Sequence, residues 1–399
     1  MIAHVAVLGG GIMGCCTALQ LARRGLTVTI VDAAGALMTG ASRWNEGKIH
    51  LGYLYAADPS LATARRLLPG GLAFRPLMED LLGQSIAPAV ADHDETYLVH
   101  RRSVAGVDAT ANYFDRVADM VGEAADHRAY LSAGAARRPV RLSAAALAQI
   151  TDSEELLAGF SVPERSVSTT WIADRLADAV AAEPRIRPRL GVRVDGVRRH
   201  ADGRFGLLIH ADEDGRYDAV VNALWHGRIA VDRSLGLPLP VEFTHRYRVS
   251  AFVRTSAPIE VPSLVIGTGP FGDVKRYGDR EAYLSWYESG LLVESTQVEP
   301  PSPPEMTPDR EARVSREIVE RLGQYVPSVR GIGPTLTSVR VRGGWVYASG
   351  RGPLSDAAST LHRRDRVGAT ADGRYVSVDT GKYSIAPWLA VQVAGQMVP

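Results

Sequence analysis

The sequence contains very little lysine. Of its 45 basic residues only Lys48, Lys275 and Lys382 are lysines, and the others are arginines. An ammonium group is a compact charge whose pKa shifts readily on burial, whereas a guanidinium stays charged. In a chain that otherwise uses arginine for its surface charge, each lysine is either retained for chemistry or has survived by chance.

Cysteine and long apolar runs are also scarce. The two cysteines, Cys15 and Cys16, are adjacent, so a disulfide between them would be strained and would close no loop. We therefore expect free thiols in a reducing cytoplasm. No basic region precedes the first apolar run, and no stretch reaches the ~20 apolar residues of a membrane span. These absences predict a cytoplasmic protein without a signal peptide or a membrane-spanning segment.

No charge of one sign dominates the chain. Its net charge is +1 and its isoelectric point is near 7.9. This balance gives no electrostatic reason to expect binding to nucleic acid or to a membrane surface, although a small anionic substrate needs only local charge. At 399 residues the chain is too long for one simple core, so we expect two domains.

The most informative stretch runs from Val5 to Asp32. An apolar run breaks into three glycines, an amphipathic helical pattern follows, and a second apolar run ends on the aspartate. A strand, a helix and a second strand in this order form the half-domain that binds a dinucleotide. The helical pattern ends just before Gly25, a residue typical of a helix C-terminus.

The small residues of this unit each have a physical role. Gly9 permits a sharp turn, Gly11 leaves room for a pyrophosphate at the helix N-terminus, and Gly14 lets the helix pack closely on the strand. Ile12 and Met13 begin the helix beside that phosphate position. Asp32 can accept hydrogen bonds from ribose hydroxyls.

Helical and strand-like patterns alternate along the rest of the chain. Helices are predicted over residues 61–82, 167–182, 309–325 and 386–396, and Thr307 and Pro308 are expected to cap the third. Strands are predicted over residues 192–197, 217–224, 246–253 and 282–287, and a hairpin over 204–223 with its turn at 212–215. Residues 39–56 are predicted to be a loop or an extended segment beside the cofactor, residues 300–308 a proline-rich bend, and the stretch that begins at Val339 a set of glycine-rich loops.

Four stretches resemble the FAD-dependent D-amino acid oxidase superfamily, namely the opening unit and residues 45–61, 218–223 and 381–387. The resemblance implies an α/β fold with a discontinuous, Rossmann-like FAD-binding domain of the glutathione-reductase type and a second, mixed antiparallel-sheet substrate domain. We assign residues 1–80, 167–236 and 339–399 to the first domain and residues 81–166 and 237–338 to the second. One departure is Leu224-Trp225-His226-Gly227, where the family usually has a glycine directly after the D-A-V-V-N-A strand.

Two branches of the superfamily are represented. The first segment is similar to L-2-hydroxyglutarate dehydrogenases at Asn45, Gly47, Ile49, His50, Gly52, Tyr55, Ser60 and Leu61. V-K-R-Y at residues 274–277 and K-Y-S at residues 382–384 are similar to sarcosine oxidases. In that branch one lysine lies over the flavin and promotes reaction with oxygen, and another helps hold the substrate carboxylate. The resemblance implies these roles for Lys275 and Lys382.

The resemblance and the opening unit together suggest a set of residues that contact FAD. The set consists of Gly9, Gly11, Ile12, Met13, Gly14, Asp32, Ser42, Arg43, Asn45, Gly47, Lys48, Ile49, Gly381, Lys382, Tyr383 and Ser384. It contains no group that we expect to bind a metal. Lys382 lies in a glycine turn before the last helix, where free N–H groups can meet the flavin.

Catalytic roles are considered for His50, Lys275 and Lys382. A neutral imidazole at position 50 could accept the proton that an amine or hydroxyl loses, orient the substrate, or carry a covalent flavin link. A fixed cation at position 275 would favour electron transfer from reduced flavin to oxygen, because that step makes superoxide. A structural histidine and a solvated lysine are the alternative readings of these two residues.

Aromatic and arginine side chains could contact the substrate. The candidates are Tyr53, Tyr55, Arg246, Tyr277 and Trp286. Arg246 and Arg248 share one face of a predicted strand and could bind a carboxylate. Aromatic residues at strand spacing are more often part of a core, and such an arginine pair is more often solvated.

The sequence therefore predicts an enzyme that contains FAD and oxidises a CH–NH or CH–OH group of a small, carboxylate-bearing substrate, with oxygen as the electron acceptor and hydrogen peroxide as the product. Three alternatives remain open. These are an FAD-dependent 2-hydroxyacid or alcohol dehydrogenase with another acceptor, an NAD-dependent dehydrogenase of the β-hydroxyacid type, and a flavin-binding protein without catalysis. The sequence does not indicate an oligomeric state.

Overall fold

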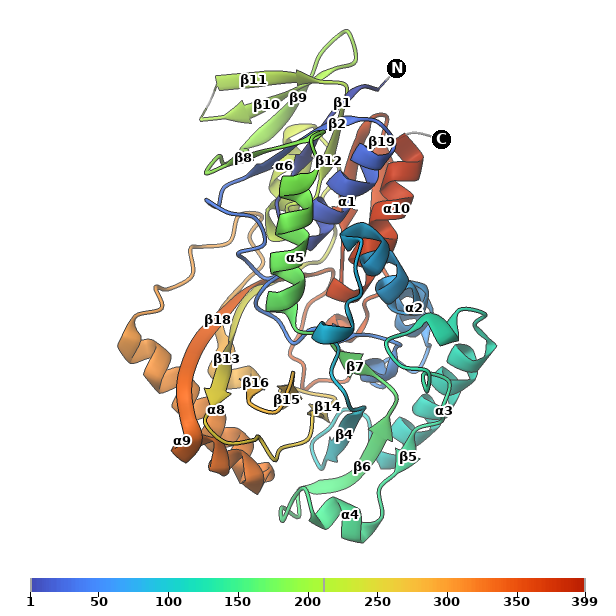
Figure 1. The fold of residues 1–399 in the computed structure, drawn as a ribbon, viewed down its shortest axis with the longest axis vertical. Coiled ribbons are helices and arrows are strands. Elements are labelled where there is room, and N and C mark those ends of the chain that lie inside the picture. Colours follow the sequence, from blue (N-terminus) through green and yellow to red (C-terminus); the bar gives the residue numbers. More distant parts are fainter. Residues whose placement is uncertain (1, 211, 398–399) are drawn as a thin grey trace.

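The computed structural model describes residues 2–210 and 212–397. Figure 1 shows two parts, one above the other, each built on its own sheet. The upper sheet has six strands in the order β19 (Gly368–Asp372), β20 (Tyr375–Asp379), β12 (Ala219–Asn222), β1 (His4–Leu8), β2 (Thr27–Asp32) and β8 (Ile186–Leu190). Its central strand, β1, pairs in parallel with both β2 and β12.

The two faces of the six-stranded sheet are covered differently. Val5 and Val7 of β1 pack into the core beneath the helices, whereas Ala6 and Leu8 pack under a small sheet on the other face. This alternation is the period of two expected for a strand. The small sheet consists of β9 (Gly196–Arg199), β10 (Phe205–Ile209) and β11 (Asp212–Tyr217), and α6 (Arg228–Ser234) lies beside it.

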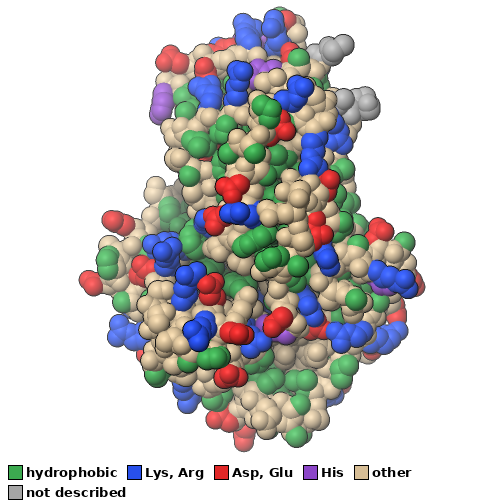
Figure 2. Space-filling model, in the orientation of Figure 1, with side chains coloured by type: hydrophobic (Ala, Val, Ile, Leu, Met, Phe, Trp, Pro, Cys, Tyr) green, Lys and Arg blue, Asp and Glu red, His purple; other side chains and the backbone are tan. Residues whose placement is uncertain are grey.

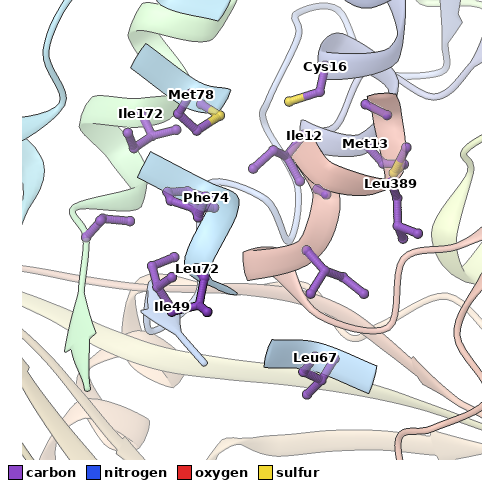
Figure 3. Close-up of a cluster of buried hydrophobic side chains, with 14 of the residues drawn as sticks. Ile12, Met13, Cys16, Ile49, Leu67, Leu72, Phe74, Met78, Ile172 and Leu389 are labelled. Carbon is purple, nitrogen blue, oxygen red and sulfur yellow. The ribbon is translucent and has the colours of Figure 1, made fainter. Parts of the chain in front are cut away.

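Four helices form the main core of the upper part. They are α1 (Ile12–Arg23), α2 (Ala62–Leu82), α5 (Thr169–Ala182) and α10 (Ala386–Met397). Figure 3 shows Cys16 of α1, Phe74 and Met78 of α2, Ile172 of α5 and Leu389 of α10 within this cluster. Cys15 and Cys16 are both buried and free, which confirms that they are not paired in a disulfide.

The lower part is built on a nine-stranded, mostly antiparallel sheet. Its order is β17 (Leu291–Ser295), β13 (Thr244–Thr255), β16 (Glu281–Trp286), β15 (Gly272–Arg276), β14 (Leu264–Gly267), β4 (Glu95–His100), β6 (Leu156–Val162) and β5 (Val140–Arg141), and β18 (Leu336–Ala348) also pairs with β13. The helices around it are α3 (Val107–Glu123), α4 (Ala144–Ala148), α7 (Tyr287–Gly290), α8 (Pro308–Tyr325) and α9 (Ile332–Thr335). Val314, Ile318 and Leu322 of α8 pack on the sheet.

A short two-stranded sheet joins distant parts of the chain. It pairs β3 (Lys48–Ile49) with β7 (Arg165–Ser166). The predicted α/β fold with two unlike sheets is confirmed. We propose that each large sheet defines one of the two predicted domains, with the last boundary near residue 348, because all of β18 belongs to the lower sheet.

The predicted helices are present with the expected ends. Ser168 caps α5 and Thr307 caps α8, each by accepting a backbone hydrogen bond, and Gly25 has the left-handed φ of +86° after α1. Helix α2 continues through Pro69, although proline normally interrupts a helix.

Three strand and loop predictions were wrong. Residues 192–195 are not a strand, and β9 begins only at Gly196. The predicted turn at residues 212–215 lies inside β11, where Gly215 (φ +74°) accompanies a register shift typical of a bulge, and Ile209 of β10 pairs with Asp212 of β11. In the stretch that begins at Val339, residues 339–348 belong to β18 and residues 368–379 contain β19 and β20. The glycines of β18 are needed there because a Cβ at Gly343 would lie 1.8 Å from the carbonyl oxygen of Arg248 on β13.

The charge on the visible surface and the hydropathy of the helices can be compared with what the composition predicts. On the face shown in Figure 2, acidic and basic side chains are interspersed. Within the described residues, no helix is both long enough and apolar enough to cross a membrane.

Gly71 of α2 provides a test of how this helix packs. A Cβ at Gly71 would lie 2.0 Å from the carbonyl oxygen of His50, whereas a Cβ at Gly122 in α3 would meet nothing within 4 Å. Gly71→Ala should therefore lower the free energy of unfolding by about 1–3 kcal/mol through overpacking. The control Gly122→Ala should raise it by up to about 1 kcal/mol, because alanine favours a helix. Urea unfolding measures both, and equal effects would contradict the assigned contact.

Candidate active site

A cavity of about 1220 Å³ extends between the two parts of the molecule. Its walls come from the ends of β1 and β2, from the segment before β3, from β13, β18 and the β14–β15 region, and from the turn before α10. The sequence-predicted residues that line it are Gly9, Gly11, Ile12, Met13, Asp32, Ser42, Asn45, Lys48, His50, Tyr55, Arg246, Gly381, Lys382 and Tyr383. Residues far apart in the sequence are thus brought to one cavity.

The glycines at one end of the cavity allow close approach of the backbone. Gly9 has φ +101°, and a Cβ there would lie 2.7 Å from the carbonyl oxygen of Ala223. A Cβ at Gly14 would lie 1.8 Å from the carbonyl oxygen of Gly9, so only glycine lets α1 start this near β1. A Cβ at Gly11 would lie 2.9 Å from Ser42 Oγ. These residues form the tight strand-to-helix turn expected at a pyrophosphate site.

Asp32 and Ser42 hold the two sides of this turn. The Asp32 carboxylate accepts hydrogen bonds from the backbone N–H of Gly10 (2.5 Å) and of Ala34 (2.7 Å). Ser42 Oγ accepts one from the N–H of Ile12 (3.0 Å) at the start of α1, where Gly11 provides no side-chain cap. Residues 9–13 at the α1 N-terminus line the cavity, and the N-terminus of a helix suits an anionic group.

The segment that carries His50 is held by buried polar groups. Tyr130 Oη donates to the carbonyl oxygen of Ile49 (2.6 Å), and Glu164 accepts hydrogen bonds from the N–H groups of Leu51 (2.6 Å) and Gly52 (3.1 Å). Glu164 is fully buried. The backbone on both sides of His50 is therefore fixed.

His50 itself is a neutral base in a buried position. The side chain is 1% exposed, and its Nδ1 has no hydrogen-bond partner among the described residues. Burial, followed by the positive charges of Lys382 and Lys48, lowers the pKa of His50 well below its ordinary value of 6.5. The imidazole is therefore uncharged near neutral pH and can accept a proton.

Lys48 and Lys275 share one buried carboxylate. Each ammonium Nζ lies 2.6 Å from Glu95 Oε2, and all three side chains are at most 1% exposed. Lys48 also donates a hydrogen bond to Tyr97 Oη (2.8 Å). Lys48 lines the cavity, whereas Lys275 lies behind it.

The pKa values of Glu95, Lys48 and Lys275 are shifted to different extents and in different directions. Burial alone would raise the pKa of Glu95, but Lys275 and Lys48 lower it to about 2. Burial alone would lower the pKa of Lys48, but Glu95 and Glu164 outweigh burial and raise it. Burial and then repulsion from Lys48 lower the pKa of Lys275 against the attraction of Glu95. Lys48 is therefore the more firmly charged of the two lysines.

Lys382 stands at the same end of the cavity as His50. It follows Gly381, whose φ is +62° and whose N–H donates to Asp379 Oδ1 (3.0 Å). The Lys382 ammonium lies 5.7 Å from the ring centroid of Tyr55, and the His50 ring centroid lies 5.7 Å from the same ring. Burial, together with the charges of Arg364 and Arg246 and against the attraction of Glu46, lowers the pKa of Lys382 to about 8.

Several predicted site residues lie away from the cavity. Arg43 pairs with Asp174 of α5, Tyr53 packs against Phe114, and Tyr277 donates a hydrogen bond to the carbonyl oxygen of Asn45 (3.3 Å). Trp286 stacks on Tyr325 within the core of the lower sheet. Since none of these side chains lines the cavity, we no longer propose Tyr53, Tyr277 or Trp286 as substrate contacts.

Three predicted cofactor residues support the cavity from behind. Gly47 has φ +65°, and a Cβ there would lie 2.0 Å from the carbonyl oxygen of Val167. Ile49 lies in the main core shown in Figure 3, and Ser384 is fully buried at the turn before α10. We retain a cofactor role for these residues only through the backbone that they position.

The departure at Leu224-Trp225-His226-Gly227 forms part of the cavity wall. Trp225 adopts a left-handed φ of +58°, and its indole N–H donates to the carbonyl oxygen of Trp345 on β18 (2.6 Å). His226 stacks on the ring of Trp345. The chain thus passes the cavity with a tryptophan in the conformation that a glycine normally takes, and the hydrogen bond to β18 holds it there.

Sequence reasoning missed four charged residues of the site. Glu95 and Glu164 lie in a region without a recognisable motif, although an acid beside a strand-like apolar run is a signal for a buried partner. Glu46 and Arg364 line the cavity from loops, and no local pattern marks them. Arg364 is brought to the site only by the tertiary fold.

The arrangement suits an extended dinucleotide that ends in an electron-accepting ring. One end of the cavity offers glycine backbone, helix N–H groups and Asp32, whereas the other offers His50, Lys48 and Lys382. A pyrophosphate fits the first set and a flavin beside a substrate fits the second. The residues present therefore fit FAD.

Comparisons with known proteins agree with this geometry. A model of the family described as "DAO: FAD dependent oxidoreductase" matches residues 4–374. The structure is similar to glycine oxidase from Geobacillus kaustophilus, with a TM-score of 0.66 and 16% identity over 100% of this chain and 96% of that chain. It is also similar to L-alpha-glycerophosphate oxidase from Mycoplasma pneumoniae with FAD bound, with a TM-score of 0.60 and 14% identity over 99% and 94% of the two chains.

A curated relative matches over a shorter stretch. Glycerol-3-phosphate dehydrogenase 1 of Mycobacterium tuberculosis is 45% identical over 62 residues, which are 16% of this chain and 12% of that protein. Because so little of the dehydrogenase is covered, its activity is not transferred by this match.

The shared carboxylate predicts a large effect on stability. Glu95→Gln should lower the free energy of unfolding by about 3–5 kcal/mol, because it leaves two buried ammonium groups facing each other. The control Asp80→Asn removes the partner of Arg23 in an exposed pair and should cost less than about 1 kcal/mol. Urea unfolding at neutral pH distinguishes them.

The same measurement repeated in acid checks the charge of Glu95. Its pKa is lowered to about 2 from an ordinary 4.5, so its stabilisation is complete above pH 4.5 and is lost as the pH falls towards 2. In Glu95→Gln that part of the acid dependence should be absent. An unchanged acid dependence in the variant would contradict the ion-pair assignment.

Proposed function

The chain belongs to the DAO family of FAD-dependent oxidoreductases, and we propose that it oxidises a CH–NH or CH–OH group of a small substrate that bears a carboxylate. The observation that carries the proposal is that a neutral His50 and a cationic Lys382 line one cavity, each 5.7 Å from the ring centroid of Tyr55. FAD, when bound, accepts a hydride from carbon and passes the electrons to an acceptor. The family excludes the NAD-dependent alternative.

In this proposal Lys382 binds the substrate and His50 accepts its proton. The Lys382 ammonium pairs with the carboxylate and fixes the substrate in one orientation. The His50 imidazole takes the proton from the nitrogen or oxygen of the reacting group as the C–H bond breaks. Tyr55, which is 7% exposed and whose Oη lacks a partner among the described residues, can donate a hydrogen bond to the same substrate.

A proline-rich segment forms part of the cavity wall. Residues 298–306 line the cavity and are tied to the upper part by Glu299, which pairs with Arg193 (3.2 Å) and Arg233 (3.3 Å). The burial of Lys382 itself strengthens its attraction to the carboxylate.

Oxygen is the electron acceptor that we propose, and Lys48 is the cation that would assist it. Lys48 lines the cavity and keeps its charge, whereas Lys275 is fully buried behind Glu95. Lys275 then acts as a positioning residue through the shared carboxylate. The burial of Lys275 also favours a second candidate function, a dehydrogenase that passes electrons to an acceptor other than oxygen.

The proposed oxidation is tested by anaerobic mixing with 2-amino and 2-hydroxy acids. The flavin absorbance should be bleached by at least one of them, and His50→Asn should slow this reduction at saturation by about 10²–10⁴-fold while retaining flavin. In the unmodified protein the rate should stay flat from about pH 6 to about pH 7, because the pKa of His50 lies well below 6.5 and Lys382, with a pKa of about 8, stays charged. The control His127→Asn, outside the cavity, should behave normally. No bleaching by any of these acids would overturn the proposal.

The role of the lysines is tested in the second half-reaction. Lys48→Met should slow reoxidation of the reduced flavin by oxygen on the order of 10²-fold, the size of losing one fixed charge, and should leave anaerobic reduction nearly intact. Lys275→Met should have a smaller effect on reoxidation. Stopped-flow absorbance measures both steps. A larger effect of Lys275→Met would assign the direct role to that residue, and negligible oxygen reactivity of the unmodified protein would support the dehydrogenase.

A further inference from the structure

We propose that the substrate carries a second anionic group, a carboxylate or a phosphate ester, and that Arg246 and Arg364 bind it. This inference rests on the proposed function, because it places the second group in the same cavity as His50 and Lys382. It specifies a dianionic substrate rather than a simple amino or hydroxy acid.

Arg246 is a buried guanidinium that has spare hydrogen-bonding capacity. It lies on β13, is 3% exposed and lines the cavity. Its Nη1 donates to Tyr287 Oη (2.8 Å), but its Nε has no partner among the described residues. No carboxylate of the described residues forms an ion pair with it. A buried charge without a counter-ion is costly, so an anion is required nearby.

Arg364 approaches the same place from a different segment. It follows a short 3-10 helix (Thr360–His362), and its backbone N–H donates to Thr63 Oγ1 of α2 (2.9 Å), which fixes the backbone at this position. Its side chain lines the cavity and forms no ion pair or hydrogen bond with the described residues. Both guanidinium groups therefore line the same cavity. Burial and then the charge of Arg246 lower the pKa of Arg364 to about 10.

The acids nearby are already engaged by other cations. Glu46 is held charged by Lys382, followed by Arg248 and Lys48, which together lower its pKa against burial. Asp379 lies 3.8 Å from Arg228 and accepts the N–H of Gly381, and burial raises its pKa. Neither carboxylate lies within ion-pair distance of Arg246 or Arg364.

A substrate with a single carboxylate would leave this pair uncompensated. If that carboxylate binds Lys382, then Arg246 and Arg364 still repel each other at the cavity wall. Guanidinium groups form paired, parallel hydrogen bonds with carboxylate or phosphate oxygens, so two of them suit one doubly ligated anion. The geometry therefore selects for a molecule with anionic groups at two positions around the reacting carbon.

The test is a set of calorimetric titrations of the FAD-loaded enzyme with molecules that it cannot oxidise. The probes are acetate as a monocarboxylate, succinate as a dicarboxylate, and phosphoglycolate as a carboxylate with a phosphate ester. At least one dianion should bind about tenfold or more tightly than acetate, and the tighter of the two identifies the second group. Equal binding of all three would overturn the proposal.

Variants assign the effect to the arginines. Arg364→Met should weaken binding of the preferred dianion about tenfold or more and leave acetate unchanged, and Arg364→Lys, which keeps the charge but not the fork, should weaken it less. The matched control is Arg363→Met, because the adjacent Arg363 pairs with Asp365 and does not line the large cavity. Flavin content and the melting temperature verify folding, and Arg246→Lys provides a second, independent variant.

The outcomes separate this inference from the proposed function. Binding is measured without turnover, so a dianion preference that depends on Arg364 supports the site even if no acid bleaches the flavin. Conversely, bleaching by a monocarboxylate acid together with an unchanged Arg364→Met would keep the oxidation and reject the second anionic group.

Discussion

Two buried carboxylates hold the site together. Glu164 binds the backbone on the far side of His50, and Glu95 neutralises both Lys48 and Lys275. Both acids belong to the lower part of the molecule, whereas residues 48–52 pass beneath the upper part. The position of the proposed base therefore depends on charges supplied across the junction of the two sheets. In a low-dielectric interior such contacts are strong only if every partner is present.

The two ends of the cavity differ in charge, and this difference sets which part of a bound dinucleotide and substrate each end suits. At one end, glycine backbone and the α1 N-terminus favour a pyrophosphate, and Asp32 stands where a ribose is expected. At the other end, Lys48, Lys382 and the arginines create a positive region. Burial and then the charges of Lys382 and Lys48 keep His50 neutral, and the positive region attracts an anionic substrate, so one arrangement serves both proton transfer and binding.

The sequence was sufficient for the elements whose signals are local. The strand–helix–strand unit and the cap of α8 were recognisable because short-range chemistry specifies them, and the segment around His50 was recognised by its resemblance to the family. The turn at Gly215 and strand β18 were misread because glycine signals a loop in sequence, whereas here it permits a bulge and a close strand contact. Arg364 and Glu95 could not be placed, since only long-range pairing brings them to the cavity. Trp286 was misplaced because an aromatic residue on a strand has the same pattern in a core and in a pocket.

The scarcity of lysine acquires a physical meaning in the fold. Lys48 and Lys275 converge on a single oxygen of Glu95 at 2.6 Å each, a geometry that suits compact ammonium groups better than two planar guanidinium forks. Lys382 occupies a buried position where its pKa falls to about 8, which a guanidinium would not reach. By contrast, Arg246 and Arg364 line the cavity, where a guanidinium can form paired hydrogen bonds with an anion. The choice between the two cations thus follows what each position must do: share a carboxylate, respond to its surroundings, or bind an oxyanion by paired hydrogen bonds.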